Sequence, residues 1–247
     1  LRETRHLGIV YDQRKMWAHE ARVTAATEHK FDPYFEASTD ASFADDEETH
    51  RSTSGFVVWF AGAPIEWECK RQPLVTLSTM ESEYVAASRC VLAIRFLHKF
   101  LRFVDFPRDH PTRVLEDNAA CIAITDKPVH RQRSKHIGVK FMNVREASLA
   151  GEVKLVAVAT EHQVADLFTK SRAKGPFLRL RDTLMGTVPF TDMVRQHQET
   201  VKAEKAAVKY VTNINPGQWP TYTIPPAPET FLSAILGTDE IKECEDL

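Results

Sequence analysis

Residues 55–72 read GFVVWFAGAPIEWECKRQ, two apolar, β-rich runs interrupted at Gly62-Ala63-Pro64. Two such runs with a short glycine-containing break predict a β-hairpin. The preceding FEASTDASFA at 35–44 alternates small and apolar residues like a strand, and the acidic stretch at 45–55 predicts a turn. PLVTLS at 73–78 is a further short run of this kind. We therefore expect three antiparallel strands to open the central domain.

A long helix is predicted directly after these strands. Ser78 at the N-cap and Glu81 three residues later form a capping box, in which the two side chains satisfy free backbone N–H groups of the first turn. Apolar residues then recur at helical spacing and predict one buried stripe, with the helix ending before Pro107. These residues are Val91, Ile94, Leu97, Leu101 and Val104.

Helices and strands alternate through the rest of this region. The pattern predicts a strand at 112–117, a short helix from Asn118, a helix at 136–150 stopped by Gly151, and a strand at 152–160. The segment 161–171 predicts a helix with Thr160 as N-cap and Gln163 at its third position, and 177–186 a last amphipathic piece. The order βββ-α-β-α-α-β-α is typical of an α/β fold with helices packed on a mixed sheet.

The character of the sequence changes after Gly186. Residues 192–210 predict a polar surface helix, 215–230 are rich in proline and extended, and 239–247 form an acidic tail. We therefore separate a C-terminal extension, 187–247, from a domain at 34–186 and a leading segment, 1–33.

Charge, cysteine content and hydropathy exclude several classes of protein. The net charge of −2 means that any nucleic-acid site rests on local basic patches. The four cysteines are Cys69, Cys90, Cys121 and Cys244. Because they form no CxxC pair, we expect neither a zinc knuckle nor a disulfide framework. This cysteine usage favours a reducing compartment. No apolar run approaches the roughly 20 residues of a membrane span, and the first residues lack the apolar core of a signal peptide. We expect neither membrane association nor secretion.

Four acidic residues stand where a surface loop explains them poorly. Asp40 lies within a strand pattern and Glu83 one turn inside the long helix, while Asp117 ends an apolar strand and Asp166 lies in the middle of a helical run. Such a carboxylate must be solvated, paired or metal-bound, because burying a bare charge is costly. If the four elements converge, a hard cation such as Mg²⁺ relieves the repulsion, and two ions about 3.5–4 Å apart suit phosphodiester cleavage.

Each acid also has an ordinary interpretation that, taken singly, is at least as good. Asp117 would cap the helix that follows it, Glu83 would be an exposed helical acid, and Asp40 would belong to a turn. Asp166 would form an i,i+4 ion pair with Lys170. From the residues alone, both interpretations stay open.

Six short blocks of the chain carry a family resemblance: RSTSG, K-R-Q-P, S-T-x-E-x-E-Y-V-A, D-N-x-A, K-H-I and A-D-L-x-T-K. Their order and spacing resemble the ribonuclease H domain of Ty1/copia-type retrotransposon polyproteins. The resemblance covers residues 35–186, and together the blocks are highly specific. The opening LRETRHLGIVYD resembles the segment that joins an upstream reverse transcriptase to this domain, which would make 1–33 a remnant of that connection.

The resemblance implies a ribonuclease H-like fold, with a five-stranded mixed sheet, strands 1–3 antiparallel, and flanking helices. It also implies that Asp40, Glu83, Asp117 and Asp166 are the catalytic and metal-binding residues. Two Mg²⁺ ions, with Mn²⁺ as a substitute and Asp40 bridging both, would drive hydrolysis of the RNA strand of RNA–DNA hybrids. The implied partners are the hybrid and the reverse transcriptase domain of the same polyprotein, in the cytoplasm, in virus-like particles or in the nucleus.

Two basic stretches and two single residues are candidates for holding the substrate, because hybrid binding requires neutralisation of phosphates and contacts to 2′-hydroxyl groups. A solvated basic loop explains the arginines of the longer stretch equally well, and a helix N-terminus explains His162 better. The candidates are Lys70, Arg71 and Gln72, then Asn118, then Arg131, Arg133, Lys135 and His136, and last His162.

Two other functions compete with a ribonuclease H. One is a ribonuclease H-like module that binds nucleic acid or protein without turnover, against which the complete set of four acids argues. The other is an integrase or transposase of the same fold superfamily. The K-R-Q-P and S-T-x-E-x-E-Y blocks do not belong to those enzymes, so this alternative ranks last.

Overall fold

The computed structural model describes residues 8–9, 31–32, 34–126 and 138–212. Its centre is one five-stranded sheet in the order β3-β2-β1-β4-β5. The strands are β1 (Phe35–Ser42), β2 (Thr53–Phe60), β3 (Ala63–Arg71), β4 (Thr112–Glu116) and β5 (Val153–Ala157). β1, β2 and β3 pair antiparallel, whereas β4 runs parallel to β1 and β5 parallel to β4. The predicted mixed sheet with three antiparallel strands is confirmed.

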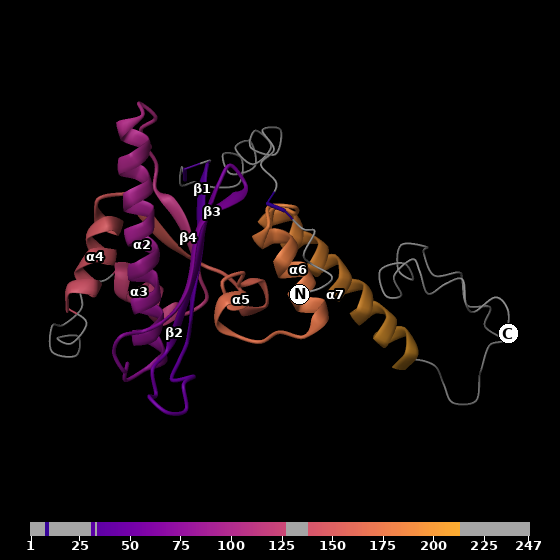
Figure 1. Ribbon diagram of the computed structural model, residues 1–247. Coiled ribbons are helices and arrows are strands. Elements are labelled where there is room, and N and C mark those ends of the chain that lie inside the picture. The colour runs from indigo at the N-terminus through magenta and orange to yellow at the C-terminus, as the bar shows by residue number, and fades with distance from the viewer. Residues whose placement is uncertain (1–7, 10–30, 33, 127–137, 213–247) are drawn as a thin grey trace, which may run out of the picture. The chain divides into compact units, whose positions relative to one another are not determined.

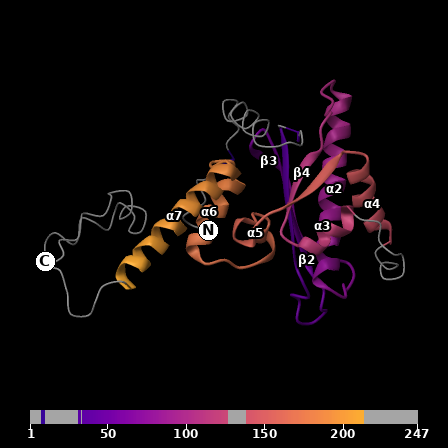
Figure 2. The same cartoon turned by 180° about the vertical axis from the view of Figure 1, so that it is seen from behind.

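Helices cover both faces of this sheet, as Figures 1 and 2 show from opposite sides. On one face lie α2 (Thr79–Phe103), α3 (Ala119–Asp126) and α4 (Gly138–Leu149). On the other lie the short α5 (Asp166–Thr169), which follows the 3₁₀ turn η2 (Thr160–His162), and α6 (Lys174–Leu184). A last helix, α7, spans Phe190–Thr212.

The alternation of side chains along β1 and β2 assigns them to these two faces. Phe35 and Ala37 of β1 join the larger apolar cluster, which α2 and α4 complete with residues such as Ile94 and Val144. Val57 and Trp59 of β2 belong to a second cluster with Val164, Leu180 and Met193. Both sheet faces are therefore buried, and Asp40 lies where the sheet meets α5.

The start of α2 follows the predicted capping box. The Ser78 hydroxyl accepts a hydrogen bond from the Glu81 N–H at 3.2 Å, and the Glu81 carboxylate accepts one from the Leu77 N–H at 2.7 Å. Glu81 is thus used by the helix terminus, which leaves Glu83, two residues further along, as the remaining acid at the start of α2.

Two sequence predictions are wrong in detail. Pro73–Ser78 forms no strand, because it connects β3 to α2, where Thr76 is buried against Ser52. The segment 161–171 is not one helix: η2 ends at His162 and α5 starts only at Asp166. Between them the backbone of Gln163 is extended rather than helical. The side-chain amide of Gln163 donates from Nε2 to the Thr39 carbonyl of β1 at 2.9 Å.

The compact unit extends beyond the boundary that we expect at Gly186. The chain divides into Leu1–His197 and Gln198–Leu247. Val188, Phe190, Met193 and Val194 pack in the second apolar cluster, so the first turns of α7 belong to the core rather than to an extension. The later part of α7 contributes helix to the second unit. Predictions for 10–30 and for 213–247 lie outside the described residues.

Candidate active site

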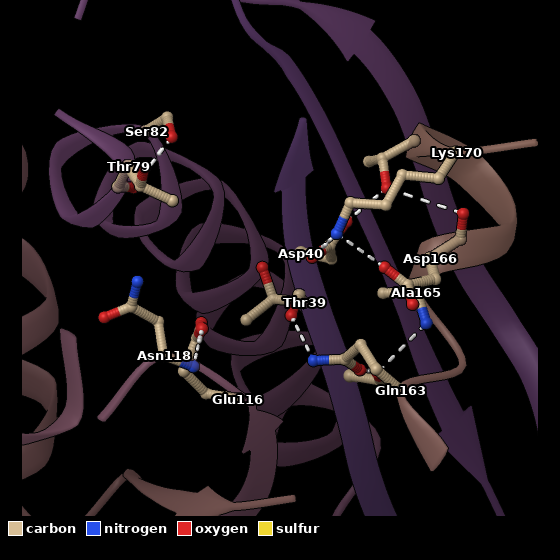
Figure 3. A network of polar contacts seen from close by, with 12 residues as sticks. Thr39, Asp40, Thr79, Ser82, Glu116, Asn118, Gln163, Ala165, Asp166 and Lys170 are labelled. Atoms are coloured by element: carbon tan, nitrogen blue, oxygen red, sulfur yellow. Dashed lines mark hydrogen bonds and ion pairs between the residues drawn. The ribbon is translucent and has the colours of Figure 1, made fainter. Parts of the chain in front are cut away.

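Asp40 lies at the meeting point of the sheet and α5, with its side chain fully buried. One carboxylate oxygen accepts a hydrogen bond from the Lys170 ammonium at 2.9 Å, and the other accepts one from the Thr169 hydroxyl. Both donors come from the end of α5, as Figure 3 shows for Lys170. A buried carboxylate is tolerated here because cationic and hydroxyl donors surround it.

Asp166, the first residue of α5, is equally buried and faces the same ammonium. Lys170 reaches its Oδ1 at 2.7 Å, and Arg172 forms a second ion pair with its Oδ2. The i,i+4 pair with Lys170, proposed above as the ordinary interpretation of Asp166, is therefore present. It does not remove Asp166 from the site, because the same ammonium also contacts Asp40 (Figure 3).

Glu83 and Asp117 complete the acidic group from the other side. Carboxylate oxygens of Asp40, Glu83 and Asp117 all lie within 4.8 Å of one another. Glu83 is 3% exposed, and its Oε2 has no hydrogen-bond partner. Burial raises the pKa of Glu83 to about 10, and the charges of Glu116, Asp40 and Asp117 add to this effect. The structure thus brings three of the predicted acids together directly and joins the fourth through Lys170.

Glu116 is a fifth acid that the sequence interpretation missed. It is fully buried at the end of β4, where its Oε1 accepts the Asn118 N–H at 3.0 Å and its Oε2 has no partner. Burial raises its pKa to about 8, against the lowering effect of that hydrogen bond. The strand alternation contains a signal for it, since Glu116 is two residues from the core residue Val114 and so shares its face.

A divalent cation fits this donor set. Three carboxylates from three separate elements converge, and the buried oxygen of Glu83 lacks a protein donor. Hard cations take carboxylate oxygens as ligands, and a bound cation would favour the charged form that burial disfavours in Glu83. Asp40, Glu83 and Asp117 are the residues that would hold it.

Lys70, Arg71 and Gln72, at the end of β3, differ in their exposure to solvent. Lys70 is exposed, and Arg71 forms an ion pair with Asp46 at 2.9 Å while remaining half exposed. Gln72 is 1% exposed, and its amide donates to the Ser54 hydroxyl and the Ser82 carbonyl, both at 2.9 Å. Lys70 and Arg71 are available to a substrate, whereas Gln72 is used inside the fold to join β2 to α2.

Of the remaining candidates for substrate binding, Asn118 has a role inside the fold and the basic loop is not described by the structure. Asn118 caps α3, because its Oδ1 accepts the Cys121 N–H at 3.0 Å; it takes the capping role that we considered for Asp117. The basic loop with Arg131, Arg133, Lys135 and His136 lies outside the described residues. Its role in substrate binding therefore stays a prediction.

His162 is 5% exposed and packs edge-on against His197 of α7, with ring centroids 5.2 Å apart. Glu161, His162 and His197 also have potential ligand atoms within 4.8 Å of one another. However, the Arg179 guanidinium donates to His197 Nδ1 at 3.1 Å and to the Glu161 carbonyl at 3.0 Å. A fixed positive charge beside this group disfavours a cation there, and we interpret the cluster as the contact between η2 and α7.

Comparisons with known proteins give relatives in sequence and similar solved structures. No family model matches the chain. The retrovirus-related Pol polyprotein of transposon TNT 1-94 from Nicotiana tabacum is 30% identical over 146 residues, which are 59% of this chain and 11% of that polyprotein. The Pol polyprotein of transposon RE2 from Arabidopsis thaliana is 29% identical over 141 residues, 57% of this chain and 10% of that one. The chain thus spans about a tenth of the length of these relatives.

Among solved structures, LC11-RNase H1, isolated from compost by a metagenomic approach, is similar with a TM-score of 0.43 and 16% identity. The match covers 55% of this chain and 92% of that one. The strand order, the three antiparallel strands and the flanking helices define a ribonuclease H-like fold. In sequence the chain is similar to one part of the Pol polyproteins of retrotransposons.

Proposed function

We propose that this domain is a metal-dependent endonuclease that hydrolyses the RNA strand of RNA–DNA hybrids. The observation that carries the proposal is the convergence of Asp40, Glu83 and Asp117 from β1, α2 and the end of β4, with Asp166 facing Asp40 across one ammonium. Asp40, Glu83 and Asp166 are buried and Asp117 is partly exposed. Burying acids costs stability, so such a cluster is a candidate functional site. The homology to Pol polyproteins supports the same function.

Mg²⁺ is the cation that we propose, with Mn²⁺ as a substitute, because both take oxygen ligands. When bound, two such ions activate a water for in-line attack and stabilise the leaving oxygen. The chain's own contribution is the placement of the carboxylates. Asp40 is held by the rigid β1–β2 pairing, and Glu83 by a helix that is fixed at its N-terminus.

The proposed partners are the RNA–DNA hybrid and the reverse transcriptase domain of the same polyprotein. Among the basic side chains near β3, Lys70 and Arg71 are the accessible candidates for phosphate contacts. No helix among the described residues is long and apolar enough to cross a membrane. We further propose that the protein acts in the cytoplasm, within virus-like particles of an active element, or in the nucleus.

The test is a cleavage assay on a labelled RNA–DNA hybrid in the presence of Mg²⁺ or Mn²⁺. We expect cutting of the RNA strand only, with 3′-hydroxyl and 5′-phosphate ends, and its loss in Asp40→Asn by a factor of about 10² or more, since one carboxylate of the constellation is removed. Asp105→Asn is the matched control, because Asp105 is exposed beyond the C-terminus of α2.

Folding is checked in both variants by circular dichroism. A folded wild-type chain that binds hybrid and never cuts it, with either metal, would contradict the nuclease and favour the binding module without turnover.

A further inference from the structure

Lys170 lies among the carboxylates that would hold a metal ion, where a lysine is unusual. Its ammonium lies 2.9 Å from Asp40 Oδ1 and 2.7 Å from Asp166 Oδ1, and so joins two fully buried carboxylates that come from β1 and α5 (Figure 3). A charge-assisted hydrogen bond at such distances is strong. The ammonium is therefore a firmly held part of the site.

The backbone fixes where this lysine begins. Lys170 is the C-cap of α5, and its N–H donates to the Asp166 carbonyl at 2.8 Å, so the side chain starts one helical turn from the acid that it contacts. The neighbouring Thr169 donates its hydroxyl to Asp40. The side chain of Lys170 is nevertheless 36% exposed, which leaves the ammonium a path to solvent or to a ligand.

The two halves of the acidic group differ in how their charge is compensated. Lys170 and Arg172 both pair with Asp166, and Lys170 also pairs with Asp40. Among the described residues, no ion pair is recorded for Glu83 or Asp117. A cation that contacted both Asp40 Oδ1 and Asp166 Oδ1 would occupy the position of the ammonium, and two positive charges in one place repel strongly.

We propose that Lys170 is a positioning residue that limits the hybrid-free protein to one divalent ion, held by Asp40, Glu83 and Asp117. The inference rests on the proposed function. Asp166 becomes available to a second ion when the Lys170 ammonium moves to a phosphate of the bound nucleic acid, which is the one class of ligand in this reaction that offers it an equal anionic partner. The lysine thereby makes complete metal loading dependent on substrate.

The experiment counts bound Mn²⁺ per chain by electron paramagnetic resonance, on the chain of 247 residues without nucleic acid. We expect one ion in the wild type, two in Lys170→Met, and one in Lys170→Arg, because arginine keeps the charge. Lys99→Met is the matched control, since Lys99 is exposed on α2 about four turns beyond Glu83, and it should bind one ion.

The outcomes separate this inference from the nuclease itself. Two ions in the hybrid-free wild type, or a single ion in a folded Lys170→Met, would overturn the role of Lys170 and leave the nuclease proposal standing. If the wild type binds no Mn²⁺ at all, both the proposed metal-dependent function and the role of Lys170 fail. Should Lys170→Met not fold, the counts for the wild type and Lys170→Arg still decide, because two ions in either one contradict the proposal.

Discussion

Asp40 and Gly55 are direct partners in the antiparallel pairing of β1 and β2, and α5 lies on the glycine. A side-chain carbon at Gly55 would lie 2.7 Å from Phe168 Cβ and 2.9 Å from Thr169 Cγ2. Only the missing side chain lets α5 approach the sheet closely enough for Lys170 to contact Asp40. Gly55, the glycine of the RSTSG block, therefore leaves the space that the contact of Asp40 with Lys170 requires.

Replacing this glycine with alanine should displace α5. We expect Gly55→Ala to lower the free energy of unfolding by about 1–3 kcal/mol, the usual cost of overpacking, and to reduce hybrid cleavage at least tenfold because Asp166 moves away from Asp40. Gly175→Ala is the control, since no atom lies within 4 Å of the added carbon and alanine favours helix α6. Denaturant unfolding and the cleavage assay measure both effects. Equal behaviour of the two variants would contradict the role of Gly55.

A buried polar network holds α5 to the strand that carries Asp40. Ser38 Oγ donates to the Gln163 amide and accepts the Ala165 N–H at 3.2 Å. Ser38→Ala leaves both groups without this partner, so we expect a loss of about 1–3 kcal/mol in stability and faster hydrogen exchange in α5. Ser148→Ala on α4 should change neither quantity. Unchanged exchange in α5 would show that the Ser38 hydroxyl does not contribute to holding it.

Buried carboxyl groups should make the metal-free protein less stable at high pH. Burial raises the pKa of Glu83 from 4.5 to about 10 and that of Glu116 from 4.5 to about 8. The folded state then binds protons more tightly than the unfolded state, so this stabilisation is complete below pH 4.5 and is lost as the pH rises through the two folded values.

In EDTA we therefore expect the Tm to fall between pH 4.5 and about pH 10, and to fall less in Glu83→Gln. Glu48→Gln in the exposed acidic turn should keep the wild-type slope. Mg²⁺ should reduce the fall, because it stabilises the charged carboxylates. A Tm that is level across this range in EDTA would refute the coupling.

Met193 tests whether α7 belongs to the domain. It is 1% exposed within the second apolar cluster, so Met193→Ala should lower the free energy of unfolding by about 2–5 kcal/mol. Met142→Ala is the matched control, because Met142 is 60% exposed and its loss should stay within about 0.5 kcal/mol. Similar small losses in both variants would place the end of the domain before α7.

Local patterns in the sequence predict most of the fold. The strands β1 to β3 follow from β-rich runs and a glycine break, and the start of α2 follows from Ser78 and Glu81, because these signals act between neighbouring residues. The same local reasoning fails at 161–171, where the Gln163 amide makes hydrogen bonds to β1 instead of capping a helix. Such partners are far away in sequence and leave no periodic signal.

The candidate site shows a similar division. The four acids stand out because each lies in apolar or regular surroundings, and the structure brings them to one place, although their catalytic roles stay predictions. The sequence does not single out Glu116, because the neighbouring Asp117 already accounts for an acid at the end of β4. The contacts of Lys170 with both Asp40 and Asp166 depend on how α5 docks, which no local pattern describes.

The contact between Asp40 and Lys170 joins residues 130 positions apart in the sequence. The β1–β2–β3 meander, by contrast, pairs neighbouring segments. Closing a long loop costs more chain entropy than closing a short one, and such distant contacts slow folding. During synthesis β1, β2, β3 and α2 leave the ribosome long before α5 does. The acidic group around Asp40 therefore cannot be complete until nearly the whole domain has been made.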